Sequence, residues 1–173
     1  MTQTPSSARA ATGESKAAGK YLTFAIGDED FGLEILKVRE IFGMMPITAV
    51  PRMPKHVKGV INLRGQVIAV VSLRTKFGMP EIPSTDQTCI IVVEHANDGR
   101  KVDTGIIVDR VSEVLSIAES QIEPPPDLGN GTEAAFITGM GKVGKSVKIL
   151  LDIDKLLAGQ EDLTLPATLA NAA

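Results

Sequence analysis

A ten-residue segment of this chain recurs 73 positions later. Residues 32–41 align with residues 105–114: the glycine, one valine and one glutamate match, and most other apolar positions exchange Leu, Ile and Val. A second stretch recurs at an offset of 80, pairing Gly59 with Gly139, Val67 with Val147 and Leu73 with Ile153. An insertion of seven residues near the Pro124–Pro126 loop would reconcile the two offsets. Two unrelated hairpins of similar composition would also align this well, but we favour a duplicated unit.

The apolar composition favours strands. The chain of 173 residues has 15 Val and 16 Ile, all between Ile26 and Ile153, and 3% aromatic residues. β-branched side chains fit a pleated sheet and lose side-chain freedom in a helix. Turn sequences separate the apolar runs and predict hairpins: Gly27–Asp30, Arg64-Gly65, Asn97-Asp98-Gly99 and Gly141–Gly144.

The sequence therefore predicts an all-β fold with a few short helices. One or two helical turns are expected at Leu36–Ile41, Leu73–Phe77 and Ile153–Leu157. Asp154 is a candidate cap for the last of them.

The folded body is predicted to span residues 21–157. Residues 1–20 contain no Val, Ile, Leu or Phe, so they are expected to form a disordered tail, and residues 158–173 a C-terminal tail. The body divides into approximate halves, 21–83 and 87–157, with strand exchange between them left open. Units this small bury little surface alone and should share an apolar interface. A row of Ile35, Val38 and Ile41, echoed by Val108, Val111 and Val114, is expected to line that interface.

No catalytic constellation, cofactor site or metal site is predicted. One cysteine and two histidines cannot build an internal disulfide or a His/Cys zinc cage. His56 and His95 are interpreted as surface or loop residues, and Cys89 as a buried, inert thiol. Residues 139–144 have the spacing G-x-G-x-x-G, but a strand follows them, which indicates a turn rather than a dinucleotide site.

Charge and hydropathy narrow the possible surroundings of the chain. A net charge of −3 is unfavourable for binding nucleic acid. The longest apolar stretches are far below the ~20 residues that span a bilayer, and no apolar signal segment is visible near the N-terminus. The expected location is the cytoplasm.

The hairpin tip at Asn62–Gly65 differs from its repeat counterpart, Lys142–Lys145, so the fold tolerates another sequence there. In one interpretation Asn62 and Gly65 simply make the turn. In the other, Arg64 is held at an exposed tip and forms charge-assisted hydrogen bonds with a partner. Glu40 is either its complement or part of a solvated face.

Several ordered motifs resemble the CheW family of bacterial chemotaxis coupling proteins. The resemblance extends from about Tyr21 to Leu157 and is carried by Tyr21–Phe24, Gly27–Glu29, Gly32–Ile41, Lys58–Gly65, Leu73–Phe77, Gly105–Val114 and Ile137–Gly139. It implies two five-stranded β-barrels of the Src-homology-three kind, intertwined around a shared apolar core.

The resemblance also implies a function without catalysis. Proteins of this family bridge the histidine kinase CheA, through its regulatory domain, to the cytoplasmic tips of methyl-accepting chemoreceptors, and meet the membrane only indirectly through receptor arrays. The family's contact motifs fall on Val38, Glu40, Gly59 and Arg64, and Asn62, at the same hairpin tip as Arg64, is a further candidate partner-binding residue. A groove between the barrels, with Ile35, Ile41, Val108 and Val111 as candidates, would accept the receptor hairpin.

Two alternatives stay open at this point. A small β-barrel that binds single-stranded nucleic acid would need a basic groove and stacking aromatic residues, which this composition does not favour. A CheW-like module fused to a kinase or to a receiver domain is the other alternative. Because the chain ends soon after Leu157, the stand-alone form is expected.

Overall fold

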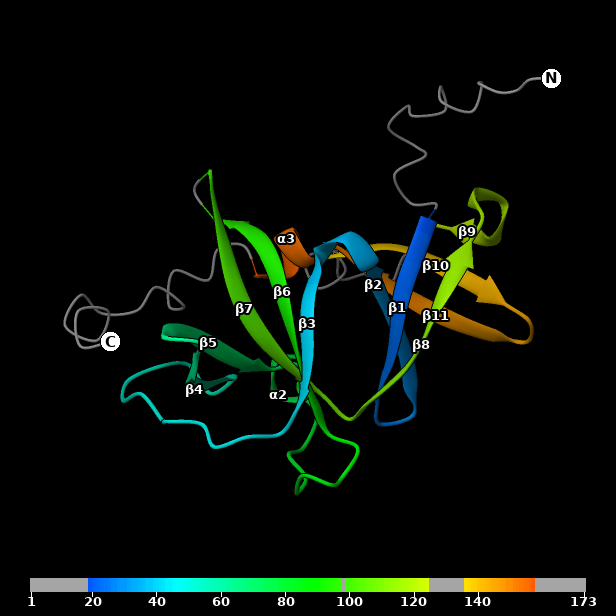
Figure 1. The fold of residues 1–173 in the computed structure, drawn as a ribbon. Helices are drawn as coiled ribbons and strands as arrows, with labels where there is room; N and C mark the ends of the chain where they lie inside the picture. Colours follow the sequence, from blue (N-terminus) through cyan, green and yellow to red (C-terminus); the bar gives the residue numbers. More distant parts are fainter. Residues whose placement is uncertain (1–18, 98, 125–135, 158–173) are drawn as a thin grey trace.

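The computed structural model describes residues 19–97, 99–124 and 136–157, which form two β-sheets with a few short helices (Figure 1). The prediction of an all-β chain is confirmed. The elements, in chain order, are β1 (Gly19–Ile26), β2 (Glu29–Glu34), the 3₁₀ turn η2 (Ile35–Lys37), β3 (Val38–Gly43), β4 (Val57–Leu63), β5 (Gln66–Ser72), α2 (Leu73–Lys76), β6 (Cys89–Asn97), β7 (Arg100–Val108), β8 (Arg110–Ile117), η3 (Glu119–Gln121), β9 (Ile122–Glu123), β10 (Ile137–Val143), β11 (Ser146–Leu151) and α3 (Ile153–Leu157).

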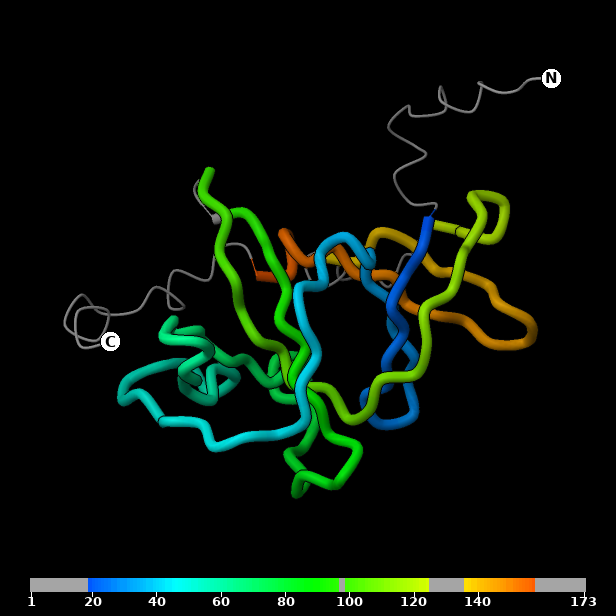
Figure 2. The backbone as a smooth tube through the Cα atoms, viewed as in Figure 1, coloured from blue at the N-terminus to red at the C-terminus, as the bar shows by residue number. Residues whose placement is uncertain are grey.

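The two sheets exchange strands. The first sheet has the order β8-β1-β2-β11-β10-β9, and the second has the order β3-β6-β7-β5-β4. The chain leaves the first sheet after β2, builds the whole second sheet, and returns at β8. In Figure 1 the blue strands β1 and β2 accordingly lie beside the yellow-green β8 and the orange β11. Figure 2 shows the backbone crossing between the sheets before β3 and again before β8.

The described strands leave both sheets open, with β8 and β9 at the edges of the first and β3 and β4 at the edges of the second. The sheets do not divide the chain at a single point, because the first contains strands from both ends of it. As folding domains, the halves 21–83 and 87–157 stay a prediction. Of the expected N-terminal tail, Gly19 and Lys20 belong to β1. Its other residues and the expected C-terminal tail lie outside the described residues.

The internal repeat is confirmed by the strand register. In the first sheet β2 runs parallel to β11, with Gly32 opposite Leu150; in the second β7 runs parallel to β5, with Gly105 opposite Val70. These two pairs are related by the offsets of 73 and 80 that the sequence predicts. The β4–β5 and β10–β11 hairpins even share a register shift at the same repeat position, before Gly59 and Gly139.

A large apolar cluster holds the sheets together. It contains strand residues of both sheets, such as Phe24 and Leu33 from the first and Ile91 and Ile106 from the second, all of them fully buried. Each sheet also has a cluster of its own, around Ile61, Ile68 and Val92 in the second and around Tyr21, Ile117 and Leu150 in the first. The predicted shared interface is therefore present, but the expected lining row is only partly right. Ile35, Val38, Val108 and Val111 belong to the interface, whereas Ile41 and Val114 are exposed.

The strands that follow the two crossings, β3 and β8, were not predicted from the sequence. The expected helix at Leu36–Ile41 is wrong beyond Lys37, because Val38–Gly43 form β3. An extra residue in β3 places Val38 and Ile41, three apart, opposite Val93 and Ile91, two apart. This bulge gives a strand the three-residue apolar spacing of a helix.

The short helices that follow each sheet agree with expectation, apart from one cap. α2 and α3 cover most of Leu73–Phe77 and all of Ile153–Leu157. The capping carboxylate of α3 is that of Asp152, which accepts a hydrogen bond from the Lys155 N–H at 3.0 Å. The expected cap, Asp154, instead lies inside the helix and binds Lys37.

Candidate partner-binding surface

The β4–β5 hairpin ends in a tight turn that projects Arg64. The side-chain oxygen of Asn62 accepts a hydrogen bond from the Gly65 N–H at 2.8 Å and so closes the turn. Arg64 has a left-handed backbone with φ of 54°, and Gly65 follows with φ of 84°. The left-handed conformation is easy for glycine and unfavourable for arginine. The turn thus places a guanidinium group where another residue would be less strained.

Arg64 forms a two-pronged ion pair with Glu40 on β3, which is the opposite edge strand of the same sheet. Its Nη1 donates to Glu40 Oε1 at 2.9 Å, and its Nη2 donates to Oε2. These hydrogen bonds hold the pKa of Glu40 below its ordinary value. Desolvation opposes this effect, whereas the positive charges of Arg64 and Arg39 also lower the pKa. The Arg64 side chain is 67% exposed, so its face away from Glu40 remains open to a partner.

A groove of about 420 Å³ lies beside this ion pair on the second sheet. Its apolar lining comes from Leu36, Val38, Leu63, Ile68 and Val92. The polar lining includes Arg39, which lies 3.7 Å from the Glu94 carboxylate and 3.9 Å from that of Asp103. Most of the exposed lining of the groove is polar, with apolar side chains between paired charges. Protein-binding surfaces combine apolar contacts with a polar rim in this way.

The other predicted contact residues lie at different depths. Ile41 is 42% exposed on β3, whereas Ile35, Val38 and Val111 are partly buried against the shared core. Val108 is 1% exposed and belongs to that core, so its side chain supports the sheets from inside. The groove is consequently lined by residues of β3 to β7 and η2 rather than by the full row expected from the repeat.

Gly59 has a packing role of its own. It has φ of 145°, and a Cβ atom there would lie 2.0 Å from the backbone oxygen of Thr48. Thr48 exchanges two backbone hydrogen bonds of 2.9 Å with the neighbouring Val60. Only glycine allows the segment before β4 to lie this close to the strand.

Comparison with known proteins identifies the family. The model of the CheW-like domain matches residues 20–161. The chain belongs to the CheW-like family.

The alignments with named relatives cover most of this chain and most of each relative. The Chemotaxis protein CheW of Klebsiella aerogenes is 40% identical over 152 residues, which are 85% of this chain and 89% of the relative. The Probable chemotaxis protein CheW of Rhizobium etli is 36% identical over 142 residues, covering 82% and 89%. The crystal structure of the scaffolding protein TtCheW from Thermoanaerobacter tengcongensis matches with a TM-score of 0.71 at 35% identity, covering 81% of this chain and 92% of that one.

Sequence reasoning missed one prominent residue of this CheW-family surface. Leu36, at the crossing between the sheets, is 89% exposed and lines the groove beside Glu40 and Arg64. The repeat contains a signal for it, because Leu36 aligns with Asp109 at the offset of 73. An apolar residue where the equivalent position is acidic, in a segment that crosses between the two sheets, indicates a local role for its side chain.

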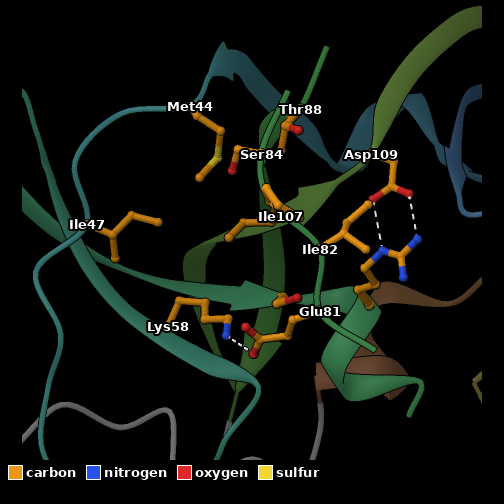
Figure 3. Close-up of a pocket in the computed structure, with 12 residues that line it drawn as sticks. Met44, Ile47, Lys58, Glu81, Ile82, Ser84, Thr88, Ile107 and Asp109 are labelled. Atoms are coloured by element: carbon orange, nitrogen blue, oxygen red, sulfur yellow. Dashed lines mark hydrogen bonds and ion pairs between the residues drawn. The ribbon is translucent and has the colours of Figure 1, made fainter. Parts of the chain in front are cut away.

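A second cavity, of about 220 Å³, lies on the same sheet under the segment before β6 (Figure 3). The apolar side chains of Met44, Ile47, Ile82 and Ile107 surround it. Its rim carries two ion pairs, Lys58 with Glu81 and Arg74 with Asp109. None of these residues is among the site candidates predicted from the sequence.

The histidine prediction is corrected in part. His95 is 3% exposed on β6, with Nε2 2.8 Å from Thr104 Oγ1, so it is a core residue rather than a loop residue. Cys89 is half-buried at the start of β6, and its thiol donates to the Gln87 carbonyl at 3.2 Å.

Across residues 19–97, 99–124 and 136–157, no three His, Cys, Asp or Glu side chains gather as a metal site would require. No helix in these residues has the length and apolarity to cross a membrane.

Proposed function

We propose that this chain is a non-enzymatic signalling adaptor that couples methyl-accepting chemoreceptors to the histidine kinase CheA. Membership of the CheW-like family supports a chemotaxis scaffold. The observation that carries the proposal in this chain is the exposed guanidinium of Arg64, bound to Glu40 at the edge of a groove that has both polar and apolar lining residues.

The backbone of Arg64 supports a role for its side chain. A left-handed conformation costs an L-residue about 1–2 kcal/mol. The equivalent position in the other half is Gly144, with φ of 59°, which fits that conformation without strain. Glycine would supply this conformation without strain but not the ion pair with Glu40. An arginine held here against strain therefore supports a role for its side chain. A planar guanidinium suits a carboxylate or backbone carbonyls of a partner.

We assign the receptor hairpin to the groove and its rim. Leu36, Val38 and Ile41 offer apolar contact, and Arg64 with Asn62 offers hydrogen bonds at one end. The regulatory domain of CheA, itself CheW-like in this proposal, would contact the sheets at other edges. Such an adaptor couples two partners by binding one of their conformational states better than another. It would lie in the cytoplasm at receptor arrays and meet the membrane through the receptors alone.

The finer architecture belongs to the same proposal. We take the two sheets to be strand-exchanged barrels of the Src-homology-three kind, because each wraps its own apolar cluster in addition to the shared one. The second sheet has the expected five strands; the first has a sixth, the two-residue β9.

The nucleic-acid alternative loses support on two grounds. The family findings give it none. In addition, base stacking needs exposed rings, whereas Phe24, Phe31, Phe77 and Phe136 stack in succession along the shared core with ring centroids 5.3–5.7 Å apart. Tyr21 is buried and Phe42 packs on the cluster of the second sheet.

A binding titration tests the proposal. The purified chain is titrated with the CheA regulatory domain and, separately, with a receptor cytoplasmic fragment. Arg64→Ala should leave the fold intact and weaken binding of at least one partner by roughly 1–3 kcal/mol, the usual worth of a charged hydrogen bond. The matched control is Lys142→Ala, which removes a cation from the other tip, where Lys142 pairs with Glu123 at 2.7 Å. Equal affinities for Arg64→Ala and the unsubstituted chain would remove Arg64 from the site.

A further inference from the structure

Two clusters of charged groups lie where the chain crosses between the sheets. The first, which we call the Arg74 latch, consists of Arg74, Asp109 and the backbone N–H of Gly27. The Gly27 N–H donates to Asp109 Oδ2 at 2.7 Å, and Arg74 donates through Nη2 to Oδ2 at 3.2 Å and through Nε to Oδ1 at 3.4 Å. Figure 3 shows Asp109 with both bonds to the guanidinium.

The Arg74 latch joins elements of both sheets. Arg74 lies in α2, directly after the second-sheet strand β5, and Gly27 lies in the β1–β2 turn of the first sheet. Asp109 is the residue between β7 and β8, where the chain returns to the first sheet, and its own N–H donates to the Ala25 carbonyl at 3.0 Å. The side chains of Arg74 and Asp109 are 16% and 23% exposed, so solvent screens this pair less than a surface pair.

The second cluster, which we call the Lys37 latch, consists of Lys37, Asp154 and the backbone N–H of Ala96. Lys37 Nζ donates to Asp154 Oδ2 at 3.0 Å, and the Ala96 N–H donates to Oδ1 at 3.0 Å. Desolvation opposes ionisation of Asp154, but the Ala96 N–H and Lys37 outweigh it and hold the pKa of this carboxyl below its ordinary value. The carboxylate is therefore charged at neutral pH.

The two latches are similar in plan, with the cation and the carboxylate exchanged between helix and crossing segment. The crossing members are one position out of register, because the repeat equivalent of Asp109 is Leu36. Lys37 lies in η2, at the other crossing; Asp154 lies in α3, after the first-sheet strand β11; Ala96 lies in β6 of the second sheet. Arg74 and Asp154 are equivalent at the offset of 80. Gly27 and Ala96 are equivalent at an offset of 69, which aligns β1 with β6. The strand register supports this offset: Phe24 pairs with Phe31, and their equivalents Val93 (offset 69) and Thr104 (offset 73) also pair. In each latch a carboxylate accepts one hydrogen bond from a backbone N–H of a hairpin and another from a cationic side chain. When the carboxylate lies on the crossing segment the cation lies on the helix, and the reverse holds in the other latch.

We infer that the Arg74 and Lys37 latches are positioning sites that fix the two sheets at one relative orientation. The shared apolar core favours contact between the sheets but has little directional preference. Charge-assisted hydrogen bonds are directional, and each latch connects a hairpin, a helix and a crossing segment of different sheets. Segments at the ends of elements are also where hinge motions between rigid bodies are absorbed. The core thus holds the sheets together, and the latches select the angle between them.

A distance measurement on the isolated chain tests this inference. In a Cys89→Ser background, spin labels are placed at Ser116→Cys on β8 and Gln66→Cys on β5, both exposed and on different sheets. Pulsed electron paramagnetic resonance then gives the distribution of the inter-sheet distance. The test variants are Arg74→Met, Lys37→Met and the two combined, each of which removes a cation and leaves the carboxylate bound to its N–H group.

The matched control is Lys148→Met. Lys148 pairs with Asp30 at 3.2 Å and the two side chains are 15% and 32% exposed, close to the values for Arg74 and Asp109, but both residues lie in the first sheet. We expect the single test variants to broaden the distance distribution, the combined variant to broaden and shift it further, and the control to leave it unchanged.

A combined variant with the same distribution as the control would overturn the inference. If circular dichroism shows that a methionine variant does not fold, Asp109→Asn and Asp154→Asn replace it, since they keep an oxygen for the hairpin N–H and lose the charge; the same two outcomes then decide. The measurement uses no kinase or receptor, so its result is independent of the proposed adaptor function.

Discussion

The tips of the β4–β5 and β10–β11 hairpins are equivalent in the repeat and differ in chemistry. Both close at the same register, with Asn62 opposite Val67 and Lys142 opposite Val147. Both need a left-handed residue, which is Arg64 in one and Gly144 in the other, with φ of 54° and 59°. The fold therefore requires the conformation and not the arginine, so the arginine is explained by what its side chain binds.

The base of each hairpin, by contrast, has a glycine in both halves, Gly59 and Gly139, and the packing of the fold requires it. A Cβ atom on Gly59 would lie 2.0 Å from the Thr48 oxygen, and one on Gly139 would lie 2.6 Å from Ile122 Cγ2 and 3.1 Å from the Glu123 oxygen. In both halves a short segment passes over the strand at this point. In these hairpins the glycine shared by both halves serves the fold, whereas the tip position at which the halves differ presents a different side chain on each surface.

The largest expected effect comes from Gly59→Ala. It combines a left-handed backbone with a clash against backbone, so we expect it to lower the free energy of unfolding by about 3 kcal/mol or more. Gly139→Ala has to displace an isoleucine methyl group and should lower it by about 1–2 kcal/mol. Urea unfolding of both variants makes the measurement. A smaller loss for Gly59→Ala than for Gly139→Ala would show that the contact with the Thr48 backbone is not the more costly of the two.

Val38→Asp should have the next largest effect. Val38 is half-buried against the shared core and also lines the groove. An unpaired carboxylate at this position should lower the free energy of unfolding by about 1–3 kcal/mol and weaken binding of a receptor fragment. Urea unfolding and a binding titration are run on the same preparation. Normal stability together with normal binding would mean that the groove is misplaced.

Exchanging the tip residues between the halves should change the free energy of unfolding less than Val38→Asp does, and should act mainly on binding. Arg64→Gly relieves the left-handed strain and should leave the free energy of unfolding unchanged or raise it by up to about 1 kcal/mol. It should weaken binding of at least one partner by roughly 1–3 kcal/mol, as Arg64→Ala does. Gly144→Arg should lower it by about 1 kcal/mol and leave binding unaffected. Thermal unfolding and binding titrations separate the two readouts. A destabilised Arg64→Gly chain would show that the arginine serves the fold after all.

The smallest expected effect is a pH dependence that one half carries and the other does not. His95 is equivalent to the buried Ile26. Burial lowers the pKa of His95 below 6.5; the Ala96 backbone, Asp154 and Asp103 oppose this and Lys37 reinforces it. As the pH falls below 6.5, the unfolded chain binds a proton that the folded chain does not, so the free energy of unfolding decreases until the pH reaches the folded pKa.

Replacing both polar partners should remove that dependence. His95→Ile with Thr104→Val leaves no buried polar group of the pair unsatisfied. Urea unfolding at about pH 7.5 and about pH 5.5 should show a smaller difference between the two conditions for the double variant than for the unsubstituted chain. The same difference in both chains would assign the pH dependence to carboxyl groups instead.

Much of the fold was predictable because turn chemistry is local. Turn sequences located four hairpins, and the repeat offsets matched the parallel register of β2 with β11 and β7 with β5. The exchanged strands β3 and β8 were missed, since a bulge in each disguises the two-residue alternation of a strand. Sheet membership was left open as well, because pairing between Gly32 and Leu150 leaves no local trace in either segment.

The candidate site was predictable where a motif departs from its repeat counterpart. Arg64 and Glu40 were expected to interact with partners, and the structure brings them together. Val108 was included because of its spacing in an apolar row, and spacing alone cannot distinguish an exposed row from a buried one. Leu36 was overlooked because it lies inside a segment interpreted as helical.

The central claim is coupling, and kinase activity tests it most directly. The purified chain is mixed with a CheA-type kinase and a receptor cytoplasmic fragment, and phosphate transfer to the response regulator is measured for the unsubstituted chain, for Arg64→Gly and for the control Gly144→Arg. If the chain is an adaptor, transfer should rise only when all three components are present, stay high with Gly144→Arg and be reduced with Arg64→Gly. No rise in transfer with the unsubstituted chain, and no binding to either partner, would contradict it.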